Sequence, residues 1–175
     1  MKLMVQIPCY NEAGTLPEVL RDIPKSIEGI SVIEVLIIDD GSTDETVAVA
    51  RQHGVQHIVS HKANKGLARS FQSGIERCIE LGADIIVNTD GDNQYAGSSI
   101  PDLVRPIVEG KADVVIGDRQ PGRNTDFSLL KRLLQRLGSA VVRHVARVDV
   151  GDAVSGFRAY SRDAALKINV MTSFS

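Results

Sequence analysis

Short apolar runs rich in β-branched residues alternate along the chain with segments of helical periodicity. The apolar runs, which predict strands, cover residues 5–8, 32–38, 57–60, 85–88 and 114–117. The segments of helical periodicity cover residues 16–23, 47–50 and 67–79. Strands separated by helices form βαβ units, in which helices cover both faces of a parallel sheet. The sequence therefore predicts an α/β fold with a Rossmann-like, mostly parallel sheet.

Length and charge limit the domain organisation and the class of partner. The chain has 175 residues, which fits one domain over residues 1–175. Residues 169–175 contain no stop signal for the helix expected before them, so we expect a longer polypeptide cut at its C-terminus. The formal charge of −2 supplies no global positive field, which argues against nucleic acid as a partner. Cys9 and Cys78 lack a CxxC spacing and are expected as buried apolar residues.

Polar and acidic residues gather directly after the predicted strands, at residues 10–12, 39–42, 90–94 and 118–119. The carboxyl ends of parallel strands share one edge of a sheet, and ligands bind at that edge. We therefore expect these clusters to converge on one crevice.

Asp39 and Asp40 end the second predicted strand. Adjacent strand residues point to opposite faces, so at most one of the two can face a ligand from within the strand, and the other needs the turn. Turn and helix-capping chemistry is the alternative interpretation for both, and also for Asp44. Thr43 and the acids after it are expected to open the second helix.

Asp90, Asp92 and Gln94 stand at alternate positions after a buried apolar run. Alternate positions of an extended segment share one side. Three oxygen side chains on one side suit Mg²⁺ or Mn²⁺, which can bridge a diphosphate and neutralise its charge as it leaves. An EF-hand is excluded, because the twelfth position counted from Asp90 is not glutamate.

The chain contains neither a Rossmann dinucleotide fingerprint nor a P-loop, so hydride transfer and ATP hydrolysis lose their main support. Two alternatives remain open at this point. A nucleotidyltransferase also places metal and carboxylates on such a sheet, although no glycine-rich loop follows the first strand. A phosphoacceptor receiver domain has an acidic pair and a later aspartate, but its pair follows the first strand and it leaves Asp92 and Gln94 unexplained.

Five ordered segments carry a family resemblance: residues 7–12, 35–44, 64–66, 90–94 and 155–158. Together they resemble the family 2 glycosyltransferases of GT-A fold, and among these the polyprenyl-phosphate sugar transferases. The resemblance implies inverting, metal-dependent transfer of a sugar from a nucleotide-diphosphate donor to an acceptor. It implies a polyprenyl phosphate as acceptor, with a polysaccharide or other hydroxyl acceptor as the alternative.

The resemblance also implies roles for matched positions. The nucleotide-sugar would be bound by Pro8, Tyr10, Glu12, Asp39, Asp40 and Asp90, and the divalent cation by Asp90, Asp92 and Gln94. The implied catalytic residues are Asp152, at the position of the family's base, and Arg119 and Arg158 as phosphate clamps. A phosphate acceptor is already ionised, so Asp152 is expected to orient groups more than to remove a proton. Surface salt bridges are the alternative interpretation of the two arginines.

Residues 129–148 combine leucines and valines at helical spacing with several arginines. Such a helix can lie on an anionic bilayer or pack its apolar stripe on the core. With a lipid-linked acceptor, the first alternative implies a full-length protein at the cytoplasmic face of the membrane. His53, His57 and His61 recur every four residues, but Gly54 and the following strand break that alignment, which predicts solvent or edge histidines rather than metal ligands.

Overall fold

The computed structural model describes residues 1–91, 96–117 and 156–168. Its strands are β1 (Lys2–Cys9), β2 (Val32–Asp39), β3 (His57–Ser60), β4 (Ile85–Asn88), β5 (Val114–Ile116) and β6 (Arg158–Ser161). Its α-helices are α1 (Leu16–Asp22), α2 (Thr46–Gln52), α3 (Leu67–Glu80), α4 (Ile100–Val108) and α6 (Arg162–Lys167). A 3₁₀ turn, η1 (Gly97–Ser99), precedes α4.

The strands form one six-stranded sheet in the order β3-β2-β1-β4-β6-β5. Strand β1 pairs in parallel with β2 and with β4, and β2 pairs in parallel with β3. Strand β6 runs antiparallel to both of its neighbours, β4 and β5. The predicted α/β class and the mostly parallel sheet are therefore confirmed, with one antiparallel strand that the apolar runs did not indicate.

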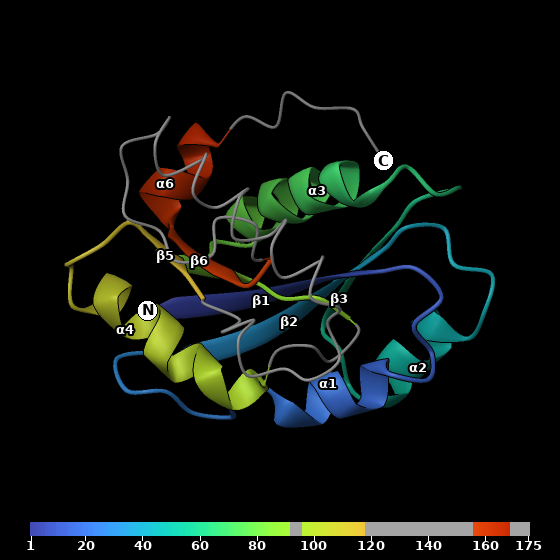
Figure 1. Cartoon of the computed structure of the whole chain (residues 1–175), viewed down its shortest axis with the longest axis horizontal. Helices are drawn as coiled ribbons and strands as arrows, with labels where there is room; N and C mark the ends of the chain where they lie inside the picture. The colour runs from blue at the N-terminus through green and yellow to red at the C-terminus, as the bar shows by residue number, and fades with distance from the viewer. Residues whose placement is uncertain (92–95, 118–155, 169–175) are drawn as a thin grey trace, which may run out of the picture.

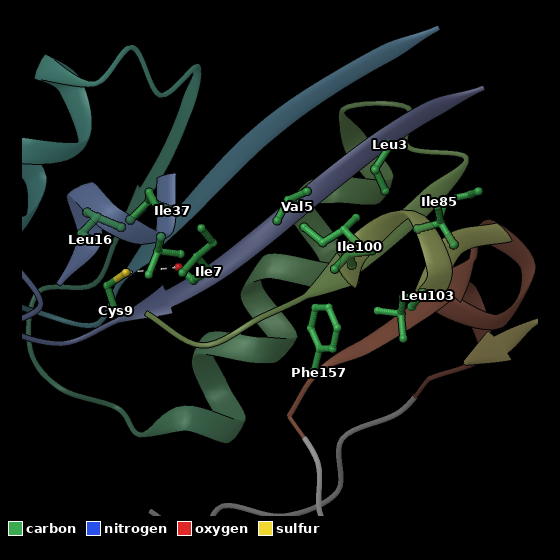
Figure 2. Packing of buried hydrophobic residues seen from close by; sticks show 14 of the residues in the cluster. Leu3, Val5, Ile7, Cys9, Leu16, Ile37, Ile85, Ile100, Leu103 and Phe157 are labelled. Carbon is green, nitrogen blue, oxygen red and sulfur yellow. Dashed lines mark hydrogen bonds between the residues drawn. The ribbon is translucent and has the colours of Figure 1, made fainter. Parts of the chain in front are cut away.

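Helices cover both faces of the sheet, as predicted. Helices α1, α2 and α4 lie on one side of it, and α3 and α6 lie on the other (Figure 1). Side chains of β1 alternate between the two cores because successive strand residues point to opposite faces. Leu3, Val5 and Ile7 pack in the larger core, which Figure 2 shows together with Ile100, Leu103 and Phe157. Met4 packs in the second core, under α3.

The predicted helix ends are confirmed at two glycines. Gly54 follows α2 with φ +74° and Gly82 follows α3 with φ +78°, both in the left-handed region. The amide of Gly54 donates to the Arg51 carbonyl at 3.0 Å, and the amide of Val55 donates to the Ala50 carbonyl at 3.1 Å. This pair of bonds is a Schellman motif, which satisfies carbonyls left free at a helix end.

Gly74 gives the first prediction, because α3 presses its backbone against the sheet there. A Cβ atom at Gly74 would lie 2.4 Å from Gln6 Oε1 and 2.8 Å from Ile38 Cδ1. Gly74→Ala is therefore expected to lower the free energy of unfolding by about 1–3 kcal/mol, in spite of the higher helix propensity of alanine. Urea denaturation measures this change. Gly14→Ala is the control, since a Cβ there meets no atom within 4 Å, and equal stability of the two variants would contradict the prediction.

Candidate functional site

A pocket of about 220 Å³ opens at the carboxyl ends of β1, β2 and β4. Of the residues that the resemblance implies for nucleotide-sugar binding, Pro8, Tyr10, Glu12, Asp40 and Asp90 line it. The beginning of α3 and the loop before it supply Asn64, Gly66, Leu67 and Ser70. Three of the four polar clusters thus converge on one crevice, as the strand pattern predicts. The fourth, residues 118–119, lies outside the described residues.

Asp40 is the buried anion of the pocket. Its Oδ1 accepts hydrogen bonds from the Lys65 amide at 3.0 Å and is 2.7 Å from His61 Nδ1, and its Oδ2 accepts from the Gly66 amide at 2.8 Å. Burial alone would raise the pKa of this carboxyl, but His61 and the two amides outweigh burial and lower the pKa. The nearby Ser70 hydroxyl adds to the lowering of the pKa. Asp40 is therefore ionised at neutral pH.

His61 is a buried partner of the Asp40 carboxylate, whereas the sequence predicts a solvent or edge histidine. Its side chain is 6% exposed, and its Nε2 is 3.1 Å from Ser73 Oγ on α3. His53 is exposed and His57 lies on the edge strand β3, so the prediction is correct for those two. The broken helical spacing carried no information on His61. The useful signal is that His61 directly follows a strand, as the other polar clusters do.

Asp39 serves the turn rather than the pocket. Its Oδ1 accepts a hydrogen bond from the Ser42 amide at 2.9 Å, and its side chain is not among those that line the pocket. Between the two residues, Gly41 has φ +77°, and its Cα faces the Ala63 backbone so closely that a Cβ would lie 2.6 Å away. One carboxylate of the pair therefore faces the crevice and the other stabilises the turn, as strand alternation predicts.

The loops after β1 and β2 are hydrogen-bonded to each other. Asn11 adopts φ 57°, a left-handed conformation that asparagine tolerates. Its amide donates to Ser42 Oγ at 3.0 Å, and its Oδ1 accepts from the Thr43 amide at 2.8 Å. The Glu12 amide donates to Thr46 Oγ1 at 2.9 Å. These bonds fix the two walls of the pocket that carry Tyr10 and Asp40.

Asp44 belongs to the same connection. Its Oδ1 accepts from the Thr46 amide at 3.0 Å, at the start of α2, and its Oδ2 accepts from the Ala13 amide at 3.1 Å. The turn interpretation is therefore the correct one for Asp44, which joins the start of α2 to the loop after β1. The helix begins later than Thr43 predicts, because its N-cap is Glu45, whose side chain makes no capping hydrogen bond.

Asp90 forms the opposite end of the pocket, where two glycines pack closely against neighbouring side chains. A Cβ at Gly156 would lie 2.7 Å from Asp90 Oδ2. A Cβ at Gly91 would lie 3.2 Å from Cys9 Sγ. Glycine at both positions lets the segment before β6 and the loop after β4 lie against the pocket wall. Asp90 and the Gly156-Phe157-Arg158 segment, which are distant in sequence, thus meet here.

Comparison with known proteins identifies the family. The sequence pattern of glycosyl transferase family 2 matches residues 4–168. The chain belongs to glycosyl transferase family 2. This membership makes the protein a glycosyltransferase and removes the nucleotidyltransferase and receiver-domain alternatives.

The names of two curated relatives describe sugar transferases that act on lipid phosphates. The UDP-N-acetylglucosamine–dolichyl-phosphate N-acetylglucosaminyltransferase of Methanococcus voltae is 27% identical over 180 residues, covering 93% of this chain and 70% of the relative. The undecaprenyl-phosphate mannosyltransferase of Micrococcus luteus is 28% identical over 180 residues, covering 97% of this chain and 70% of the relative. The resemblance to polyprenyl-phosphate sugar transferases is confirmed.

A solved structure has the same fold. It is glucosyl-3-phosphoglycerate synthase from Mycobacterium tuberculosis in complex with Mn²⁺, UDP and glucosyl-3-phosphoglycerate, with a TM-score of 0.70 and 22% identity. The match covers 93% of this chain and 57% of that chain, so the present chain spans little more than half of that protein. The GT-A fold implied by the resemblance is thereby confirmed.

Several implied family 2 residues lie outside the described residues: Asp92, Gln94, Arg119, Asp152 and the segment 129–148. Within residues 1–91, 96–117 and 156–168, no three His, Cys, Asp or Glu side chains are grouped closely enough to hold a metal ion. No helix in these same ranges combines the length and the apolar character needed to span a bilayer.

Arg158 opens β6, where it pairs with Asn88 of β4, and it is half-buried. Burial raises the pKa of the neighbouring Tyr160 phenol, and the Arg158 guanidinium opposes that effect. The side chain is not among those that line the pocket, so its role as a phosphate clamp remains a prediction.

The two cysteines are buried and free, as predicted. Burial, followed by the charges of Glu12 and Asp39, raises the pKa of the Cys9 thiol far above its usual range. Burial raises the pKa of Cys78 to about 12. Since the thiolate is the nucleophilic form, Cys9 contributes packing rather than covalent chemistry to the pocket wall.

Proposed function

We propose that this glycosyltransferase moves a sugar, with inversion at the anomeric carbon, from a nucleoside-diphosphate sugar to a polyprenyl phosphate. The observation that carries the proposal is a single pocket with a buried carboxylate, Asp40, and a second carboxylate, Asp90, at the carboxyl edge of the sheet. The names of the dolichyl-phosphate and undecaprenyl-phosphate relatives support the acceptor class.

The chemistry of the pocket favours one orientation of the donor. A helix N-terminus ordinarily attracts phosphate. At α3, however, the amides of Lys65 and Gly66 already donate to Asp40. A diphosphate beside Asp40 would meet a like charge, whereas the N–H groups of a nucleobase would find an acceptor. We therefore assign the base and ribose to the Asp40 end and the diphosphate to the Asp90 end.

Two exposed apolar side chains suit the base end. Tyr10 is 47% exposed and Leu67 is 63% exposed, and both line the pocket. A planar base that covers them removes apolar surface from water. Pro8 and Glu12 complete this wall, and Thr15 holds the Glu12 carboxylate through a 2.6 Å hydrogen bond to Oε2.

A divalent cation, Mg²⁺ or Mn²⁺, fits the oxygen donors at the other end. Asp90 would hold it together with Asp92 and Gln94, and the Mn²⁺ and UDP of the M. tuberculosis enzyme support this choice. When bound, the cation would neutralise the charge that develops on the leaving diphosphate. Arg119 and Arg158 would clamp phosphate groups in bidentate fashion, and Asp152 would orient the acceptor. Residues 129–148 would contact the cytoplasmic face of the membrane that carries the acceptor.

A thermal-shift panel tests the donor site. UDP, GDP, CDP and TDP are each added with Mn²⁺, with Mg²⁺ or with neither metal. Because a ligand at one hundred times its dissociation constant stabilises the folded state by about 2.7 kcal/mol, one diphosphate is expected to raise Tm clearly, and only with metal. Equal melting with every nucleotide and metal would contradict the proposal.

The matching nucleotide-sugar then tests the acceptor. Labelled sugar is expected to enter the organic phase when polyprenyl phosphate is supplied. Transfer to a soluble glycan in place of the lipid would overturn the acceptor assignment while leaving the donor assignment in place.

A further inference from the structure

Two buried polar side chains lie side by side on neighbouring strands of the sheet. Gln6 of β1 and Asn88 of β4 are register partners, and they are 0% and 6% exposed. Gln6 Nε2 donates to Asn88 Oδ1 at 2.9 Å. Since a buried amide without partners is costly, this bond fixes the Asn88 carboxamide with its NH₂ group pointing away from Gln6.

The Asn88 NH₂ group reaches the segment that precedes β6. Its Nδ2 donates to the Gly156 carbonyl at 2.8 Å. Gly156 in turn lies against Asp90, where a Cβ on the glycine would be 2.7 Å from Oδ2. The contacts therefore run from Gln6 through Asn88 and Gly156 to the carboxylate at the diphosphate end of the pocket.

Stability alone does not account for this polar pair. Apolar side chains of similar shape at both positions would remove two desolvated amides at little cost in stability. What an apolar pair would lack is the donor to the Gly156 carbonyl. The polar pair therefore points to a role at the far end of its contacts.

We propose that Asn88 is a positioning residue for the diphosphate end of the site. Held by Gln6, its carboxamide fixes the Gly156 carbonyl, and Gly156 then forms the wall that holds the Asp90 carboxylate toward the pocket. This inference rests on the proposed function for its ligand, but its structural core, the placement of Gly156 against Asp90, does not. The Asp40 end has its own supports in His61 and the start of α3, so the pair acts on one end of the donor alone.

The test compares Asn88→Leu, Gln6→Leu and the double variant. Each single variant leaves one buried amide without its partner and is expected to lower Tm. The double variant leaves neither amide without its partner, so it is expected to melt above both single variants and below the parent only by the loss of the donor to the Gly156 carbonyl. A defect in metal dependence that persists in the double variant therefore does not come from an unpaired buried amide.

The expected result is a split between the two ends of the pocket. In the double variant, the Mn²⁺ concentration that gives half of the diphosphate-induced shift in Tm should rise about 10- to 100-fold, as is typical when the support of a metal ligand is lost. The affinity for the matching nucleoside monophosphate without metal, which reports the Asp40 end, should be unchanged. A double variant that recovers both the parent Tm and the parent Mn²⁺ dependence would overturn the proposal.

A crystal structure of the double variant separates this inference from the proposed function. If the parent binds no nucleoside diphosphate, the proposed function fails, but the position of Gly156 still decides the inference. A displaced Gly156 and a reoriented Asp90 carboxylate support it. Both groups unmoved without the Asn88 carboxamide would overturn it.

Discussion

Asp40→Asn is expected to abolish donor binding and to lower the free energy of unfolding by about 2–4 kcal/mol, because charge-assisted hydrogen bonds contribute about 1.5–3 kcal/mol each. The carboxylate accepts from two backbone amides at the start of α3 and contacts His61. An asparagine NH₂ group would face one of these donors, and the first turn of α3 would lose its anion. Calorimetry with the matching nucleoside diphosphate and urea denaturation measure the two effects.

Asp39→Asn is the matched control. It changes the adjacent buried carboxylate, whose Oδ1 accepts one amide and whose side chain does not line the pocket. An asparagine oxygen can keep that turn bond, so the variant should bind the donor nearly as the parent does. Equal loss of binding in both variants would contradict the division of roles between the two aspartates.

The stability difference between parent and Asp40→Asn should also depend on pH. The folded-state pKa of Asp40 is lowered, so its contribution is complete above the unfolded pKa, about 3.9, and is lost as pH falls through the folded value. Denaturation curves should therefore differ by a constant amount near neutrality and converge in acid, below about pH 4. A difference that persists unchanged through the acid range would show that the asparagine acts sterically.

Asp90→Asn is expected to remove the metal dependence of diphosphate binding and to lower turnover by about a hundredfold or more. The side chain is half-buried and lines the pocket, so the fold should tolerate the change. Nucleoside monophosphate, which needs the Asp40 end only, should still bind. The measurement is the Tm shift with diphosphate across a Mn²⁺ titration.

Asp84→Asn is the control for the Asp90 variant. Asp84 precedes the other end of the same strand, β4, where its Oδ2 accepts from the Lys2 amide at 2.7 Å. Loss of that carboxylate should leave the Mn²⁺ titration unchanged. A parent-like titration in Asp90→Asn would refute the assignment of Asp90 to the diphosphate end.

The sequence contained enough information for the parallel part of the fold because its strands are continuous apolar runs. Helix α4 was not predicted, since Pro101 and Pro106 are residues that ordinarily break helices. Pro101 sits at the helix start, where proline is favourable, and Pro106 is tolerated near the end. Strand β6 was not predicted for another reason: it has four residues with polar ends and runs antiparallel, so only its neighbours in the sheet define it.

The site was predictable as far as strand ends determine it. The rule that polar residues after parallel strands share one edge of the sheet correctly predicted that Tyr10, Asp40 and Asp90 lie in one pocket. It could not show that His61 turns inward to Asp40, because that contact depends on how β3 and α3 pack. It also could not reveal the link from Asn88 to Gly156, which joins residues 68 positions apart through a side chain buried in the sheet.

The place of β6 in the sheet affects how the chain can assemble during synthesis. Strand β5 joins the sheet through β6, and β6 lies between β5 and β4. Until residues 158–161 have left the ribosome, the edge of β4 that pairs with β6 is open, and β5 lacks β6 as its neighbour. Open strand edges promote pairing between chains. The sheet, and with it the Gly156 wall of the pocket, can therefore be completed only when β6 inserts between β4 and β5, which are synthesised before it.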